Sequence, residues 1–224
     1  MSGRDAILSR VRKALGGVAD SPTRRAVVEA RLGEAPVGVI PARGQLDDKP
    51  RVALFGEMAE KVNATVQKVK SRAHVPAAIT DYLRSKNLPA SVRMGTDARL
   101  AAMPWDKQRA LTVKRGASDG DDEVGVSHAL GGVAETGTLV LHSGDDNPTT
   151  INFLPEHHIV VIDAKDIAGD LETTIEAVRR KFGKGRMPRV LNFVTGPSRS
   201  GDIEQKLLLG AHGPRALHIV VVDG

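Results

Sequence analysis

Residues 125–143 read Gly-Val-Ser-His-Ala-Leu-Gly-Gly-Val-Ala-Glu-Thr-Gly-Thr-Leu-Val-Leu-His-Ser, and the rest of the chain is best interpreted outward from them. A short strand is predicted around residues 124–126, and a small-residue turn follows at Gly131 and Gly132. The segment Glu-Thr-Gly-Thr at 135–138 leads directly into the strand-forming run 139–141. Glycines beside an acid and two threonines are typical of a tight loop with outward-facing backbone N–H groups.

Glu135 is the candidate catalytic residue of this stretch. A carboxylate positioned beside hydroxyl groups can act as a base, a nucleophile or a hydrogen-bond acceptor. An equally open alternative is a structural turn whose threonines satisfy backbone groups. The candidate ligand contacts around Glu135 are Gly132, Thr136, Gly137, Thr138 and Ser143.

A second loop follows the predicted strand 190–194 and precedes a predicted helix at 203–209. Backbone N–H groups at a helix start, together with a guanidinium group, form an attractive site for phosphate or carboxylate. The alternative is that Ser200 or Asp202 only caps the helix. The candidate ligand contacts in this loop are Gly196, Ser198, Arg199, Ser200 and Asp202.

Strands alternate with helices over the C-terminal two-thirds of the chain, which predicts an α/β fold with a largely parallel sheet. Helices are expected at 4–15, 24–32, 52–70, 76–86, 97–102 and 167–182, and strands at 73–75, 90–93, 159–162, 190–194 and 217–222. Ligands of such sheets bind beyond the carboxyl ends of the strands. We therefore expect both loops at that edge.

Composition and punctuation predict the domain organisation. Residues 1–50 are expected to form a helix and a Pro/Gly-rich linker, and residues 51–224 an α/β domain. Hydrophobic residues make up 41% and charged residues 26% of the 224, as in ordinary globular proteins. No apolar run approaches the ~20 residues that span a bilayer, and no secretory signal is found. The expected location is the cytoplasm.

The charge distribution argues against nucleic acid as a partner. The net charge is +5, and residues 1–31 hold seven basic and three acidic residues, so +4 of it lies there. A nucleic-acid-binding domain would carry basic and aromatic side chains on its folded body, and the whole chain has only one Trp, one Tyr and four Phe. The absence of cysteine excludes disulfides and Cys-ligated iron–sulfur clusters on this chain.

The seven histidines show no close metal-binding spacing, so no metal site is predicted. His157 and His158 are adjacent and would face opposite sides of a strand. His212 lies in a turn before the last strand and is a weaker catalytic candidate, as an acid or base. A structural role for His212 is the alternative. The acidic run 119–123 is expected to be a solvated loop.

Four segments in this order resemble the LUD-domain family: residues 131–141, 154–159, 196–204 and 209–215. Ser200-Gly201 stands where that family usually has Thr-Ala, which is a mild departure. The resemblance implies a three-layer α/β/α sandwich with a mainly parallel sheet, similar to the sugar-phosphate isomerase and CoA-transferase superfamily. It also implies a role in oxidising L-lactate to pyruvate, with iron–sulfur clusters on companion proteins.

Three functions stay open from the sequence. The chain could be an accessory subunit that binds a small anionic ligand for a lactate-oxidising system. It could be a free-standing enzyme that uses Glu135 on an acyl-CoA or a sugar phosphate. It could also be a module that senses a ligand without turnover.

Overall fold

The computed structural model of the protein describes residues 2–16, 21–34, 36–183, 185–201 and 208–224. The chain divides into two compact units, Met1–Val39 and Ile40–Gly224. The second unit therefore includes the eleven residues 40–50, which had been predicted as part of the linker. Among the described residues, no helix combines the length and apolar character needed to cross a bilayer.

The first unit consists of two helices, α1 (Gly3–Ala14) and α2 (Pro22–Glu34). Helix α1 begins with a capping box, in which the Ser2 hydroxyl accepts from the Asp5 backbone N–H and the Asp5 carboxylate accepts in return. These positions confirm the helices predicted at 4–15 and 24–32. Neither helix buries a described residue.

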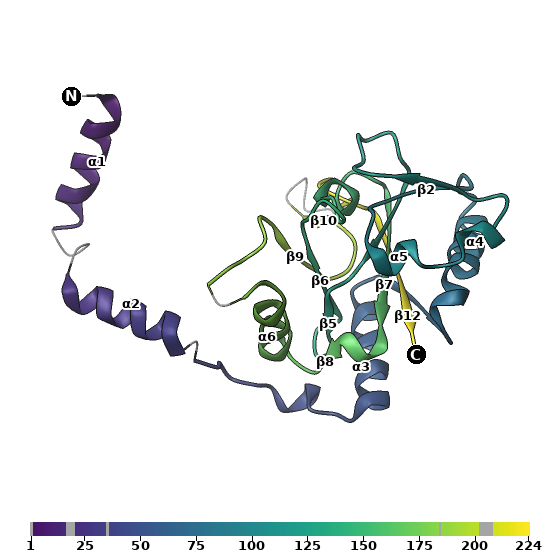
Figure 1. The fold of residues 1–224 in the computed structure, drawn as a ribbon, viewed down its shortest axis with the longest axis horizontal. Helices are drawn as coiled ribbons and strands as arrows, with labels where there is room; N and C mark the ends of the chain where they lie inside the picture. The colour runs from purple at the N-terminus through teal and green to yellow at the C-terminus, as the bar shows by residue number, and fades with distance from the viewer. Residues whose placement is uncertain (1, 17–20, 35, 184, 202–207) are drawn as a thin grey trace. The chain divides into compact units, whose positions relative to one another are not determined.

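The second unit is built on a six-stranded sheet in which every pairing is parallel (Figure 1). In spatial order its strands are β1 (Thr65–Val69), β12 (Ala216–Val222), β7 (His157–Asp163), β4 (Val124–His128), β2 (Ser91–Met94) and β3 (Thr112–Arg115). The central strands β4 and β7 are buried along their whole length, as expected for parallel strands covered on both faces. The predicted α/β class is confirmed.

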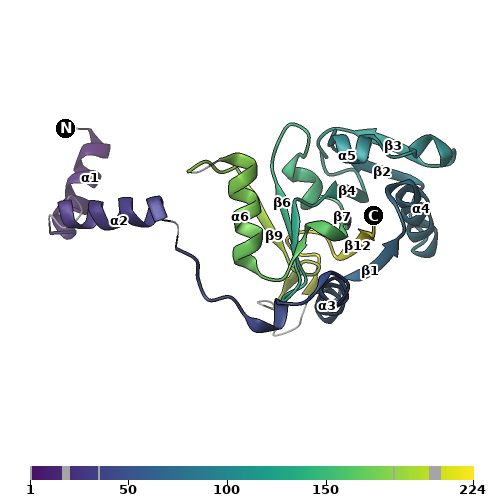
Figure 2. The same ribbon diagram turned by 60° about the horizontal axis from the view of Figure 1, so that its bottom comes forward.

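Both faces of this sheet are covered, as alternate residues of β7 show. Ile159 and Val161 pack in a cluster with α4 (Val75–Ser85) and α5 (Ala98–Ala101). Val160 and Ile162 pack in a second cluster with α3 (Asp48–Lys61) and part of a smaller sheet. Figure 2 shows α3 and α4 at separate sides of the main sheet.

The smaller sheet has the order β8 (Ile167–Ala168), β5 (Gly131–Val133), β6 (Thr138–His142) and β9 (Leu191–Val194). Strand β6 runs antiparallel to both β5 and β9. Helix α6 (Leu171–Phe182) packs on it through Val178, which contacts the cluster of Val133 and Val140. One outer layer of the expected sandwich is thus made of α3 together with this sheet and α6.

The predicted helix 52–70 was wrong in extent. The chain forms α3 up to Lys61 and then the parallel strand β1 from Thr65. Asn63 has a φ of 68°, a left-handed conformation that ends a helix. The apolar residues Val62, Val66 and Val69 continue the helical spacing across this break by coincidence.

Four shorter elements also differ from the sequence interpretation. Residues 73–75 are not a strand, because Arg72–His74 is a 3-10 helix that leads into α4. Gly131 and Gly132 form strand β5 instead of a turn. Residues 167–168 form β8 before α6 begins, and β3 had not been predicted.

The segment before α3 crosses the loop after β8 at two glycines, Gly44 and Gly169. A Cβ atom on either glycine would collide with the backbone carbonyl of the other. Gln45 adds a hydrogen bond to the Asp170 carboxylate at 2.9 Å. This glycine crossing fixes the segment that carries Arg43 against the smaller sheet.

Candidate functional site

Glu135 lies in the turn between β5 and β6 and is 6% exposed. Its N–H donates to the Gly169 carbonyl at 3.2 Å. Its Oε2 lies 3.6 Å from Nε of the exposed Arg43 and has no hydrogen-bond partner among the described residues. The acid is thus buried beside one guanidinium group.

The threonines of the two predicted loops bind one another. The Thr138 hydroxyl lies 2.7 Å from the hydroxyls of both Thr136 and Thr195. Gly137 has a φ of 66°, and a Cβ there would overlap the backbone of Ala59 in α3. The two loops are therefore in contact, and hydrogen bonds among three threonine hydroxyl groups connect them.

Gly132 and Ser143 were also predicted to contact a ligand, and both lie where strands pack or pair. A Cβ on Gly132 would lie 2.9 Å from the Ile162 side chain, which explains the glycine in that packed layer. Ser143 donates its N–H to the Val190 carbonyl at 2.9 Å and accepts the Val190 N–H with its hydroxyl at 2.9 Å.

Four residues of the second loop region gather around one hollow of about 280 Å³, here called the amino-edge hollow. Gly196, Ser198, Arg199 and His212 line it, and Glu135 is not among its lining residues. The Ser198 N–H donates to the carbonyl of Pro214, just before β12 begins. This loop therefore lies at the amino edge of the main sheet, not at the expected carboxyl edge, because β9 belongs to the smaller sheet.

The helix start predicted after this loop is not supported by the described residues. Arg199–Ser200 forms β10, which pairs antiparallel with β11 (Leu208–Leu209), so residues 208 and 209 are strand rather than helix. Asp202 and the rest of the predicted helix lie outside the described residues. The expected anion site at the start of that helix therefore stays a prediction.

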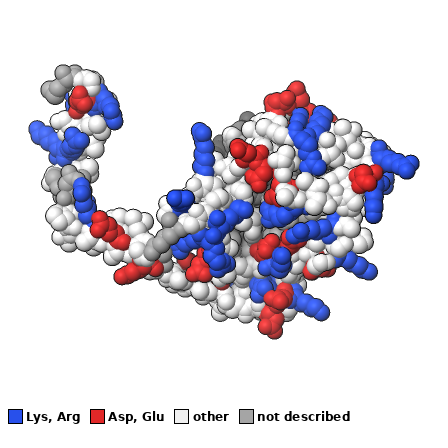
Figure 3. Space-filling model, viewed as in Figure 1, with Lys and Arg blue, Asp and Glu red and all other residues white. Residues whose placement is uncertain are grey.

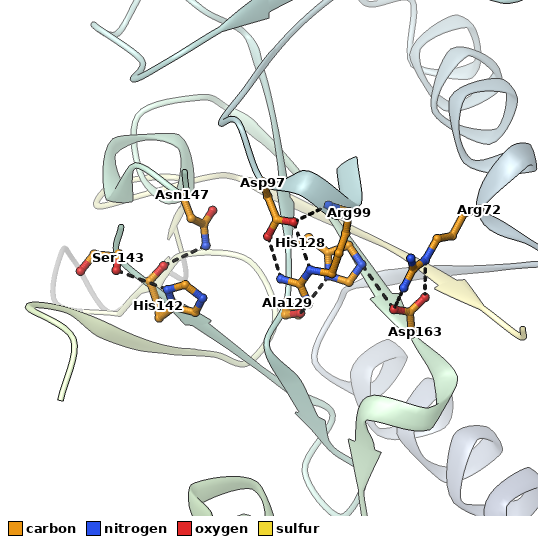
Figure 4. A network of polar contacts seen from close by, with 9 residues as sticks. All are labelled: Arg72, Asp97, Arg99, His128, Ala129, His142, Ser143, Asn147 and Asp163. Carbon is orange, nitrogen blue, oxygen red and sulfur yellow. Dashed lines mark hydrogen bonds and ion pairs between the residues drawn. The ribbon is translucent and has the colours of Figure 1, made fainter. Parts of the chain in front are cut away.

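A different polar cluster lies at the carboxyl edge of the main sheet (Figure 4). Arg72, just after β1, donates two hydrogen bonds to Asp163 at the end of β7, at 3.1 and 2.6 Å. The neighbouring Arg99 is held by Asp97 and donates to the carbonyl of Ala129 at 3.1 Å. Charged side chains that follow separate strands thus meet at one edge.

His128 ends β4 between these ion pairs and is fully buried. Its Nδ1 lies 2.9 Å from the Ala129 carbonyl, which can only accept, so Nδ1 carries the proton. Nε2 lies 3.7 Å from Asp163 Oδ2 and has no hydrogen-bond partner among the described residues. Burial, with the nearby charge of Arg99, lowers the pKa of His128 to about 4.

Asp163 is ionised beside this neutral imidazole. Burial alone would raise the pKa of Asp163, but the hydrogen bonds from Arg72 and other nearby positive charge hold it below its ordinary value. The next acid along the chain behaves differently. Burial and the charge of Asp163 raise the pKa of Asp166.

Beside this cluster lies a larger hollow of about 720 Å³, here called the lysine hollow. Its charged lining residues are Asp48, Lys49, Arg51, Lys68, Lys165 and Asp223. Arg51 is held by the Asp48 carboxylate and by the carbonyls of Leu46 and Ile167. No ion pair to Lys49, Lys68 or Lys165 occurs among the described residues, so the hollow carries an excess of positive charge.

The sequence interpretation missed this edge, although a signal was present. His128 and Asp163 are each the polar residue that closes a buried strand, and residues in that position face the ligand side of parallel sheets. The acidic run was also misjudged in part. Asp122 is buried and paired with Arg93 and Lys114, so it is structural and not solvated.

Within the described residues, no group of three or more His, Cys, Asp or Glu side chains is placed to hold a metal ion. On the face shown in Figure 3, basic and acidic side chains of residues 40–224 are interspersed.

Comparison with known proteins gives both a family match and a fold match. A family model described as LUD domain matches residues 52–222. A solved structure of a DUF162 family protein from Deinococcus radiodurans aligns with a TM-score of 0.57 at 23% identity, covering 79% of this chain and 99% of that one. At that identity the likeness shows the fold alone.

Curated relatives match over part of their length. Lactate utilization protein C from Shouchella clausii is 35% identical over 102 residues, which is 45% of this chain and 44% of that protein. The protein of the same name from Geobacillus sp. is 39% identical over 102 residues, covering 45% and 42%. The one from Halalkalibacterium halodurans is 35% identical over 121 residues, covering 53% and 52%. The chain thus spans about half the length of the curated relatives it matches.

Proposed function

The chain belongs to the LUD domain family, and from that premise we propose that it takes part in lactate utilization by binding a small anionic ligand at the carboxyl edge of its main sheet. The role is that of an accessory subunit in a system that oxidises L-lactate to pyruvate. The relatives named lactate utilization protein C support this role.

The observation that supports ligand binding is the lysine hollow. It lies where three parallel strands end: Lys68 is near the end of β1, Lys165 follows β7 and Asp223 follows β12. Such an edge is the usual ligand position in parallel α/β sheets. Ammonium groups without an acidic partner attract carboxylates and phosphates, so an anion is the ligand class that the hollow favours.

The redox chemistry belongs to partner proteins in this proposal. With no cysteine, the chain has no thiolate to bind an iron–sulfur cluster. We propose that it carries no cofactor and works in the cytoplasm beside iron–sulfur proteins that accept the electrons. The chain would position or sense the carboxylate of L-lactate, while its partners oxidise the carbon that bears the hydroxyl group.

Paired lysine variants test the site. Lys68→Gln combined with Lys165→Gln should weaken binding of L-lactate or pyruvate at least about tenfold in calorimetry, because two charge-assisted contacts are removed. The control Lys107→Gln removes an exposed lysine outside the hollow. In cells, the double variant should slow growth on lactate and leave growth on glucose unchanged. Equal binding by the double variant and the control would reject the hollow as the site.

A free-standing enzyme that uses Glu135 is the second candidate. The buried Oε2 of Glu135 favours it, because this atom lies beside Arg43 and has no hydrogen-bond partner among the described residues. In that case the isolated chain should turn over an acyl-CoA or a sugar phosphate. Glu135→Gln should then abolish turnover while the unfolding transition stays cooperative. No turnover across both substrate classes would remove this candidate.

A further inference from the structure

The amino-edge hollow has a buried polar floor that no part of the proposed function uses. Asn152 and His158 line it and are 3% and 1% exposed. Ser127 joins them from β4: its hydroxyl donates to Asn152 Oδ1 at 3.0 Å and lies 3.0 Å from His158 Nε2. Since its single proton goes to Asn152, the Ser127 oxygen accepts from His158 Nε2–H.

One hydrogen-bond donor of this buried floor has no acceptor among the described residues. Asn152 Nδ2 is buried and has no hydrogen-bond partner among the described residues. A buried donor without a partner costs about 1–3 kcal/mol, so such a group in a hollow indicates an acceptor that arrives from outside the chain.

The rim and walls define what that acceptor can be. Arg199 lies at the rim and is exposed, and no ion pair to it occurs in the described parts of the chain. The walls include Phe153 and Phe193, which are 43% and 45% exposed although they are large hydrophobic residues. At about 280 Å³ the hollow is at the small end of ligand pockets.

We propose that the amino-edge hollow is a second ligand site, which binds a small monocarboxylate with an apolar body. The carboxylate accepts hydrogen bonds from Asn152 Nδ2 and Arg199, and the apolar body packs between Phe153 and Phe193. This site is separate from the lysine hollow, which lies at the opposite edge of the main sheet.

The test follows the Asn152 side-chain amide of the full chain by NMR during titration with phenylacetate. A saturable shift of that resonance is the expected result. Phenylacetamide lacks the charge and acetate lacks the apolar body, so each should bind at least about tenfold more weakly. Lys165→Gln should leave phenylacetate binding unchanged, which separates this site from that of the proposed function.

Two variants complete the experiment. Arg199→Gln should weaken phenylacetate about tenfold, whereas Arg186→Gln, an exposed arginine outside the hollow, should change nothing. Asn152→Asp keeps the acceptor for Ser127 but faces the ligand with a negative charge, so binding should be lost. No saturable shift, or equal affinity for the acid and its amide, would overturn the proposal. Unchanged affinity in Arg199→Gln would also overturn it.

Discussion

Gly137 is a position where one residue decides whether two segments fit together. Its φ of 66° is unfavourable for any side chain, and a Cβ would overlap the backbone of α3. Gly137→Ala should lower the free energy of unfolding by at least about 2 kcal/mol, because left-handed strain and overpacking add. Urea denaturation measures this loss.

The matched control for this change is Gly56→Ala. Gly56 is buried inside α3, and an added Cβ would make an ordinary contact at 3.8 Å with Val66. Replacing a helical glycine in that setting should be neutral or should add about 0.5–1 kcal/mol. If both variants lost the same stability, the backbone argument for Gly137 would be wrong.

His128 makes stability depend on pH. Its folded pKa of about 4 lies below the unfolded value near 6.5, so the unfolded state binds the proton first as pH falls. The free energy of unfolding should therefore fall between pH 7 and pH 5, by on the order of 1–2 kcal/mol from this group. The paired carboxylates titrate at lower pH and do not contribute to this window.

Unfolding of the native chain and of His128→Gln at both pH values checks this. The variant should lose part of the pH dependence. Burial lowers the pKa values of His158 and His218 to about 3 and about 4, and it also lowers the pKa values of His142 and His157, so these four groups keep the remainder. An identical pH dependence in the variant would show that His128 is not a buried neutral imidazole.

At the level of single residues, the sequence indicated which side chains are chemically notable better than it indicated which residues they contact. Glu135 was recognised as an acid in a glycine turn, and the structure shows it buried. The hydroxyl of the nearby Thr138 contacts those of Thr136 and Thr195, and Thr195 lies 57 residues further along the chain. Local sequence carries no information about such a contact.

Among the elements, the ion pair between Arg72 and Asp163 joins the segment after β1 to the end of β7. Arg72→Leu should destabilise the chain by about 2 kcal/mol or more, because the buried Asp163 carboxylate would lose its charged partner. Thermal and urea unfolding measure this. Arg84→Gln breaks the exposed pair with Asp81 and should cost under about 1 kcal/mol. A comparable loss in both variants would contradict the role of burial.

Elements with strong local signals were predicted well, and those defined by tertiary pairing were not. The Pro76 helix and the apolar run at 159–162 appear as α4 and β7. Strand β5 contains two glycines and forms only because β6 and β8 lie on either side of it. The residues of the short strand β8 were predicted as the first two residues of the helix 167–182, because two residues are too few to show a periodicity.

On the scale of the whole molecule, residues 1–39 should be dispensable for folding of the α/β unit. Helices α1 and α2 bury none of their described residues, whereas residues 40–224 contain the three hydrophobic clusters. A chain that starts at Ile40 should keep its urea midpoint within error. A midpoint drop equivalent to more than about 1 kcal/mol would show that the first unit stabilises the second.

The sequence also predicted the class of the fold but not the position of the site within it. Alternating strands and helices were enough to predict a parallel sheet. The error about the second loop arose from one assumption, that the strand at 190–194 belongs to that sheet. It pairs instead with β6 in the smaller sheet, and this places Ser198 and Arg199 at the opposite edge.

The glycine crossing has a consequence for how the chain is made. Gly44 leaves the ribosome long before Gly169, yet the close contact between the two glycines cannot form until both have been synthesised. The segment that carries Arg43 is therefore synthesised early and completed late, after the strands and helix on the other side of the crossing exist. Nascent chains should expose this segment to proteases until translation has passed α6.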